Sequence, residues 1–257
     1  MTLELSITDG LMLLSAGCLA GVANAIAGGG TFISFPVFLW LGLPPVVANA
    51  SNAVAVWPGH ALATWGYRHD LRLNRGPLKL AGVAAGGGGA LGAYLLSTIG
   101  NAAFVKLIPF LLLAATLVFA MGPKLNRHIA TREDPSVGAG VLVGIFVFSV
   151  YGGFFGAGLG IMLMAGLLIL GVRDAHQNNA LKNLLATVVT SVGVLVLALS
   201  GLVDWPATLC AFAGAVLGGL IGARVAKFLS PQWLRACVMV LGFTLTAHYG
   251  YKYYFSA

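Results

Sequence analysis

Residues 24–31 read Asn24-Ala25-Ile26-Ala27-Gly28-Gly29-Gly30-Thr31 and interrupt an otherwise apolar run from Leu11 to Leu43. Three consecutive glycines do not continue a helix well, because each costs about 1 kcal/mol relative to alanine in a helix interior. The triplet lies where the run would reach mid-depth in a bilayer. A break there frees backbone N–H and C=O groups, which lipid does not accept but a protein-lined cavity does. We therefore expect the rest of the chain to surround this break.

The composition is that of an integral membrane protein. The 257 residues are 59% hydrophobic and 8% charged, and the mean hydropathy is +0.94. Soluble domains contain about 25% charged residues. The first residues carry Glu4 and Asp9 but no Lys or Arg, so we expect the first apolar segment to be retained rather than cleaved as a signal. A single membrane domain, residues 1–257, is predicted.

The cysteines Cys18, Cys210 and Cys237 stand alone in apolar runs, with neither disulfide nor metal-ligand spacing. We therefore expect no metal and no cofactor. The net charge of +7 is expected to reflect cytoplasmic loops and contact with anionic lipid rather than nucleic acid.

The segment lengths predict an internal repeat. Long apolar segments occur at roughly 10–41, 45–66, 77–97, 102–121, 137–170, 176–199, 206–227 and 232–251. The first and fifth are too long for one span of about 20 residues, and each is interrupted by glycine. The order of one long broken segment and three single ones therefore occurs twice. We predict an all-α bundle of two repeats, 8–125 and 136–255, joined by a cytoplasmic linker at 122–136.

The placement of Lys and Arg predicts that the second repeat is inverted. If each broken segment enters and returns, as a re-entrant hairpin or as two crossings, most basic residues share one face and only Lys106 and Lys252 lie opposite. With Lys182 inside a segment, the shared face holds Arg68, Arg72, Arg75, Lys79, Lys124, Arg127, Arg132, Arg173, Arg224, Lys227 and Arg235. Cytoplasmic loops are enriched in Lys and Arg. Both termini are therefore predicted outside the cytoplasm.

The glycine breaks are candidate anion sites. Inverted repeats with broken helices are typical of secondary transporters, whose half-helix N-termini point free N–H groups at mid-membrane. The expected contributors from the breaks are Asn24, Gly28, Gly29, Gly30, Thr31, Gly156 and Gly158. Elsewhere, Gly214, Gly218 and Gly222, like Ala84, Gly88 and Gly92, are spaced for close helix packing.

A polar stripe follows each broken segment. In the second repeat Asn179, Lys182 and Asn183 lie on one helix face with Ala186, Thr187, Thr190 and Ser191, and in the first repeat the related positions are Asn49, Ser51 and Asn52. Lys182 either faces the anion or extends to the interface by snorkelling. His60 is a candidate for proton coupling. All carboxylates lie in loops or at segment ends, which favours an anion over a metal cation as substrate.

The motifs resemble those of the sulfite exporter TauE/SafE family over essentially the whole chain. The resemblance is carried by Gly17-x-x-x-Gly21-x-x-Asn24-x-x-x-Gly28-Gly29-Gly30-x-x-x-x-x-Pro36, by Gly42-Leu43-Pro44-Pro45-x-x-Ala48-Asn49-Ala50-Ser51-Asn52, and by Gly152-x-x-x-Gly156-x-Gly158-x-Gly160 followed by Gly171. It implies transport of sulfur-containing oxyanions or sulfonates such as sulfite, thiosulfate and sulfoacetate, often outward.

Together these patterns predict a transporter in a bacterial inner membrane. Its expected partners are a small anionic substrate and the lipid bilayer, and a homodimer is the assembly considered. An anion-selective channel, or a permease for carboxylates or other organic anions, is the alternative. We do not expect an enzyme, because Ser51 and His60 are nine residues apart on one helix, about 13 Å by helical rise, and cannot pair as nucleophile and base.

Overall fold

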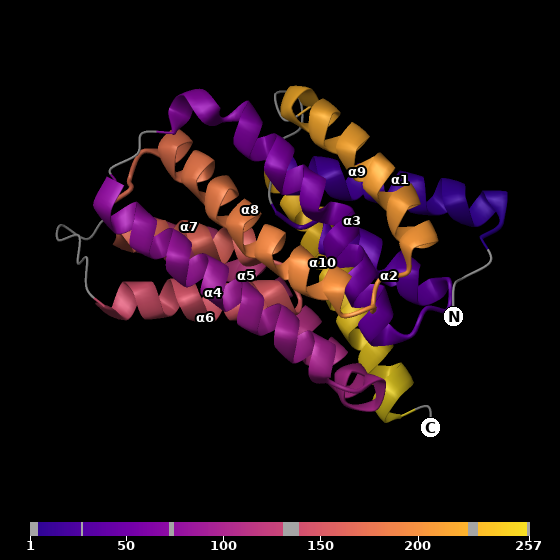
Figure 1. The fold of residues 1–257 in the computed structure, drawn as a ribbon. Helices are drawn as coiled ribbons and strands as arrows, with labels where there is room; N and C mark the ends of the chain where they lie inside the picture. Colours follow the sequence, from indigo (N-terminus) through magenta and orange to yellow (C-terminus); the bar gives the residue numbers. More distant parts are fainter. Residues whose placement is uncertain (1–4, 27, 72–74, 131–138, 226–230, 256–257) are drawn as a thin grey trace.

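The computed structural model describes residues 5–26, 28–71, 75–130, 139–225 and 231–255, which form helices joined by short turns and contain no strand (Figure 1). The helices are α1 (Ile7–Ile26), α2 (Thr31–Trp40), α3 (Pro45–Gly66), η1 (Arg68–Asp70), α4 (Arg75–Thr98), α5 (Asn101–Ala130), α6 (Ala139–Phe154), α7 (Leu159–Ile169), α8 (Ala175–Leu199), α9 (Trp205–Val225) and α10 (Pro231–Tyr254). The prediction of an all-α fold is confirmed.

Five of these helices are long and apolar enough to cross a membrane. The candidate spans are Ile7–Ala25, Leu78–Thr98, Asn101–Gly122, His176–Leu199 and Trp205–Gly222. The predicted linker 122–136 differs in part from the structure, because α5 continues to Ala130. Residues 131–136 of that linker lie outside the described residues, as does Ala27 in the first glycine break.

Each glycine-broken segment is a helical hairpin of a long and a short helix. Met12 in α1 lines the same cleft as Pro36 and Trp40 in α2, so α2 runs back toward the end from which α1 starts. In the second hairpin Gly166 of α7 packs against Ile145 of α6 in the same way. At 1.5 Å per residue, α2 with 10 residues and α7 with 11 are about 15–17 Å long, about half the length of a membrane crossing. The sequence left re-entrant hairpins and double crossings open, and the short second helix of each hairpin favours the first of these.

The two hairpins have matching backbone geometry. At the tips the N–H of Gly28 donates to the Ala23 carbonyl at 2.9 Å, and that of Gly156 donates to the Tyr151 carbonyl at 3.3 Å. After the short helices Gly42 and Gly171 adopt φ of +87° and +86°. Only glycine takes these values without strain, and it ends both short helices in the same type of C-cap.

Helix packing also follows one scheme twice. α1 packs along α9 as α6 packs along α4, and α3 contacts α9 as α8 contacts α4. Glycine makes these contacts close: a β-carbon on Gly218 would overlap the Cys18 backbone, and one on Gly88 would overlap the Phe146 backbone. The close packing predicted for these glycine rows is therefore present.

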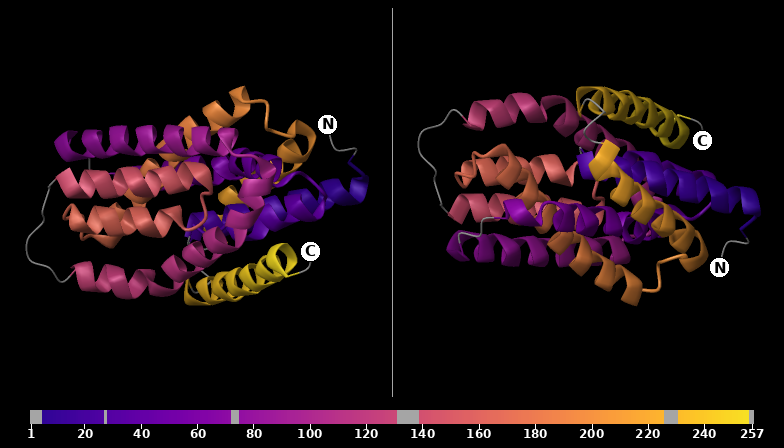
Figure 2. Two further views of the ribbon diagram at one scale, coloured as in Figure 1. Left: turned by 90° about the horizontal axis from the view of Figure 1, so that it is seen from below. Right: turned by 90° about the horizontal axis from the view of Figure 1, so that it is seen from above.

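Two further helix pairs also join the halves. α3 and α8 cross antiparallel, with the Trp57 indole N–H donating to Ser191 Oγ at 2.8 Å and the Thr64 and Thr187 hydroxyls 2.8 Å apart. α5 and α10 also run antiparallel and lie together along one side of the bundle, opposite α9 (Figure 2). The start of α1 and the end of α10 lie at the same end of the bundle (Figure 1).

Candidate anion site at the hairpin tips

The tips of the two hairpins meet inside the bundle. A β-carbon built on Gly28 would lie 3.6 Å from the Cα of Gly160, so the two backbones approach to within about the width of a methyl group. The Thr31 hydroxyl oxygen lies 3.8 Å from the β-carbon position of Gly156. The predicted glycines of both breaks are thus brought together although they are about 130 residues apart in the chain.

Asn24 shapes the first tip. Its Oδ1 accepts the N–H of Gly30 at 2.8 Å, and its side chain is buried. A β-carbon on Gly30 would collide with this amide, which explains why glycine stands there. Gly29 faces the ring of Phe119 and the side chain of Val238, where a β-carbon would be 3.0–3.1 Å away. Asn24 therefore positions the start of α2, where the N–H groups of Phe32 and Ile33 donate to the Gly29 and Gly30 carbonyls at 3.1 Å and 2.9 Å.

Lys182 lies against the second tip. Its Cδ is 3.4 Å from the β-carbon position of Gly160, and only 3% of the residue is exposed. Lys182 is seven residues into α8, about 10 Å from the start of that helix. Among the described residues it makes no hydrogen bond or ion pair. The side chain is enclosed by protein rather than extended to the interface, and its charge has no protein counter-charge.

Several enclosed polar atoms around the tips also lack partners. They are Asn24 Nδ2, His60 Nδ1 and both amide atoms of Asn183. Buried polar groups are nearly always hydrogen-bonded, so a group of unpaired ones marks a place for water or a ligand. Of these residues, Asn24 belongs to the first tip, and Gly59, the neighbour of His60 in the chain, packs on it. Asn183 follows Lys182, whose side chain contacts the second tip.

The predicted residues of the first polar stripe make hydrogen bonds within the protein, and Asn49 Oδ1 is enclosed without a partner among the described residues. The Asn49 amide donates to the Phe154 carbonyl at 2.8 Å, and Ser51 Oγ accepts the Asp204 N–H at 2.9 Å. Asn52 Oδ1 accepts the Ser34 hydroxyl. These three side chains brace α3 against α6, α9 and α2. Asn179 is half-buried near the start of α8.

Asn178 was missed by the sequence reasoning. Its amide donates to the Val172 carbonyl at 2.9 Å and to the Met164 carbonyl at 3.4 Å, so it ties α8 to the end of α7. Because Asn178 and Asn179 are identical neighbours in the sequence, the sequence alone does not indicate which of them stabilises the fold and which could line a binding site. The stripe residues Thr187 and Ser191 form the cross-links to α3 described above.

The described carboxylates lie at helix ends, away from the tips. Asp174 Oδ1 accepts the N–H of Gln177, and Asp204 Oδ1 accepts that of Ala207, so both cap helices. Among the described residues no group of three His, Cys, Asp or Glu side chains could hold a metal ion.

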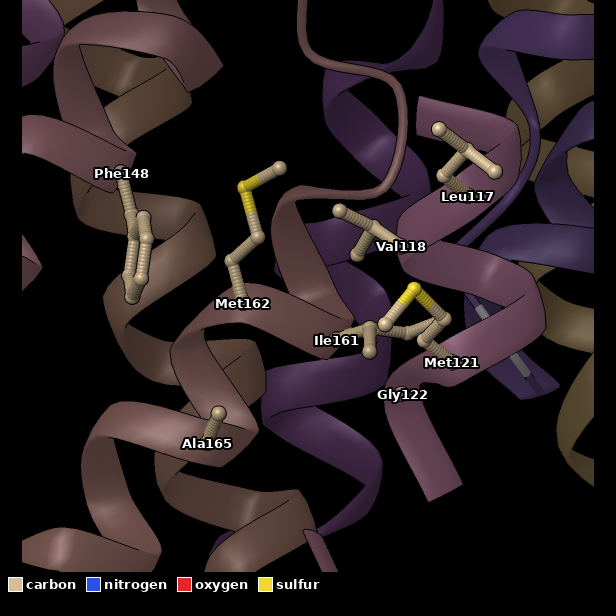
Figure 3. A pocket seen from close by; sticks show the side chains of 8 residues that line it. All are labelled: Leu117, Val118, Met121, Gly122, Phe148, Ile161, Met162 and Ala165. Atoms are coloured by element: carbon tan, nitrogen blue, oxygen red, sulfur yellow. The ribbon is translucent and has the colours of Figure 1, made fainter. Parts of the chain in front are cut away.

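A separate cavity of about 260 Å³ lies between α5, α6 and α7 (Figure 3). It is lined by Leu117, Val118, Met121, Gly122, Phe148, Ile161, Met162 and Ala165. The labelled side chains in Figure 3 carry carbon and sulfur but no nitrogen or oxygen. This cavity offers an anion no compensation for lost hydration, so we do not assign it to substrate.

Comparison with known proteins gives one family. The family model described as Sulfite exporter TauE/SafE matches residues 13–249. A "Probable membrane transporter protein" of Haemophilus influenzae is 30% identical over 92% of both chains. The "Probable membrane transporter protein ORF9" of a Sinorhizobium species is 28% identical over 91% of this chain and 89% of the relative. The "Probable membrane transporter protein YfcA" of Escherichia coli K12 is 24% identical over 92% of this chain and 87% of the relative. No solved structure matches the chain.

Proposed function

We propose that this chain, which belongs to the sulfite exporter TauE/SafE family, is a secondary transporter that binds a small sulfur-containing oxyanion or organosulfonate between its two hairpin tips. The family, the named relatives and the five apolar helices show that the chain is a multi-pass membrane protein that functions in transport and is not an enzyme. Sulfite, thiosulfate and sulfoacetate represent the proposed substrate class, and export from a bacterial cell across the inner membrane is the proposed direction.

The observation that carries the proposal is Lys182. A lysine with 3% exposure and no partner among the described residues lies against Gly160, where α7 begins. The N–H of Gly160 also has no acceptor among the described residues. A buried charge normally has a counter-charge, because desolvation costs several kcal/mol. A transported anion would supply it, with the helix N-terminus adding partial positive charge.

Alternating access is the proposed mechanism. The matching hairpins, and the antiparallel course of α3 with α8 and of α5 with α10, support two inverted repeats, in which equivalent helices run in opposite directions. The close approach of Gly28 to Gly160 leaves room for little more than a methyl group between the tips, which favours a carrier over an open channel. The distribution of basic residues supports termini outside the cytoplasm.

The test is uptake of radiolabelled thiosulfate into proteoliposomes. Lys182→Ala is expected to abolish saturable uptake. Lys106→Ala is the matched control, because it removes an exposed lysine at the far end of α5 by the same substitution. Wild-type uptake in Lys182→Ala would refute the proposed site. An equal loss of uptake in both variants would show that the loss does not come from a site at the hairpin tips.

A further inference from the structure

We infer that the ring of Phe119 seals the junction of the two hairpin tips against ion leakage, so that the protein moves its anion as a carrier. The inference rests on the proposed function and adds the side chain that keeps the two sides of the membrane apart. It is carried by the contacts of the ring, by the glycines of the tips, and by the bonds that Arg235 makes to the backbone of α5 beside the ring.

The Phe119 ring contacts both hairpin tips. Its Cζ lies 3.0 Å from the β-carbon position of Gly29 in the first tip, and its Cδ2 lies 3.7 Å from that of Gly158 in the second. The ring also packs edge-to-face on Phe32 in the first turn of α2, with the ring centroids 5.6 Å apart. Both phenylalanines are fully buried. One aromatic side chain of α5 therefore bridges the two helix breaks.

Phe119 and Lys182 reach the second tip from different helices. α7 packs on α5 and also on α8. Phe119 contacts Gly158 from α5, and Lys182 contacts Gly160 from α8. An anion that neutralises Lys182 would therefore lie on the α8 side of the tips, and the ring closes their α5 side.

The tips need such a seal because they have few side chains of their own. Backbone N–H and C=O groups without side-chain cover attract water, which a membrane interior otherwise excludes. The glycines concerned are Gly28, Gly29, Gly156 and Gly158. Hydrophobic constrictions close membrane pores by excluding water. The Phe119 ring is such a constriction, because it covers a glycine in each tip.

Arg235 of α10 fixes the backbone of α5 at the ring. Its Nε donates to the Phe119 carbonyl at 2.6 Å, and its Nη2 donates to the Ala120 carbonyl at 2.9 Å. Val238, about 4.5 Å further along α10 by helical rise, contacts Gly29 beside the ring. Arg235 is thus about one helical turn from the level of the first tip. Charged side chains inside a membrane are costly and usually functional, and Arg235 is the positioning residue of Phe119.

The experiment measures leakage and exchange separately in proteoliposomes. Leakage is the efflux of trapped chloride at a clamped membrane potential, and exchange is the uptake of radiolabelled thiosulfate against unlabelled thiosulfate inside. Phe119→Ala should raise chloride leakage at least about tenfold over wild type, because the cavity left by a lost ring collapses only in part and its polar lining admits water. Thiosulfate exchange should remain measurable, since Lys182 is unchanged.

Phe38→Ala is the matched control. Phe38 is as fully buried as Phe119, but it lies seven residues after Thr31, about 10 Å along α2 from the first tip. The same substitution there should lower stability without raising chloride leakage. A residue that only stabilises the fold would lower exchange when it is replaced and would create no leakage.

Two further variants keep the inference testable if Phe119→Ala does not elute as a folded protein in gel filtration. Phe119→Leu keeps an apolar side chain but loses the planar ring that reaches both tips, so it should leak more chloride than wild type. Arg235→Lys keeps the charge but cannot reproduce the paired bonds of the guanidinium to two carbonyls. It should also leak, because the backbone at Phe119 is no longer fixed.

Wild-type leakage in folded Phe119→Ala, or in Phe119→Leu where the alanine variant does not fold, overturns the inference. Leakage in Phe38→Ala equal to that of the Phe119 variant overturns it as well, and wild-type leakage in Arg235→Lys overturns the positioning role. Lys182→Ala tests the proposed function separately. If this variant loses exchange, the anion site stands whether or not the seal does, and if it exchanges thiosulfate as wild type does, the proposed function fails.

Discussion

Replacing Lys182 with methionine should raise the stability of the empty protein while weakening anion binding. Methionine has nearly the shape of the lysine stem and removes only the charge. The residue is 3% exposed and makes no ion pair among the described residues, so the empty protein carries an uncompensated buried charge. Replacing buried charges by apolar side chains of similar volume often stabilises proteins by about 1–4 kcal/mol.

The effect on binding follows from Coulomb's law. A unit charge on an anion at about 4 Å from Nζ interacts by about 4 kcal/mol at an effective dielectric constant near 20. Loss of this interaction corresponds to roughly a thousandfold higher Kd. The helix N-termini and the unpaired donors of Asn24 and Asn183 remain, so weak binding should persist.

The assay is thermal unfolding of the purified protein with and without thiosulfate, sulfite and sulfoacetate, since a bound ligand raises the apparent stability. Without anion, Lys182→Met should unfold at a higher temperature than wild type. With anion, the wild-type shift should be largely lost. Lys182→Arg keeps the charge and should retain part of the shift. A lower unfolding temperature for empty Lys182→Met, together with an unchanged anion shift, would refute the reasoning.

Two further predictions concern the frame around the site. Pro123 has no N–H to bond the Phe119 carbonyl four residues earlier, and Arg235 bonds that carbonyl through Nε at 2.6 Å. Arg235→Gln should therefore cost about 1–3 kcal/mol of unfolding free energy, and Pro123→Ala should reduce this cost in a double-mutant cycle; equal costs in both backgrounds would contradict the assignment. Gly218→Val should prevent folding, because the side chain would overlap α1, whereas Gly82→Ala, with open space around it, should gain up to about 1 kcal/mol. Gel filtration and thermal unfolding of the two variants distinguish these outcomes.

The breaks and the close helix contacts could be predicted because their signals are local. Glycine triplets in an apolar run, and glycines at a spacing of four, have a direct backbone consequence whatever the rest of the chain does. The partners of the polar residues could not be predicted in this way. Asn49 bonds a carbonyl 105 residues away, and Ser51 an N–H 153 residues away. A buried asparagine fits a brace or a binding site equally well until the partner is known, and only the fold supplies it.

The pairing of Asn52 with Lys182 separates what is duplicated in this protein from what is not. A shift of 130 residues places Lys182 on Asn52, and both face the first turn of the short helix in their own half. Asn52 accepts the Ser34 hydroxyl there, so its half of the site is closed by a neutral hydrogen bond. Lys182 meets Gly160, which has no side chain to bond it. The backbone scheme is thus repeated, whereas the buried cation occurs once. On the proposed function, we therefore expect the tightest anion binding on the side of the second hairpin, beside Lys182, rather than midway between the two hairpins.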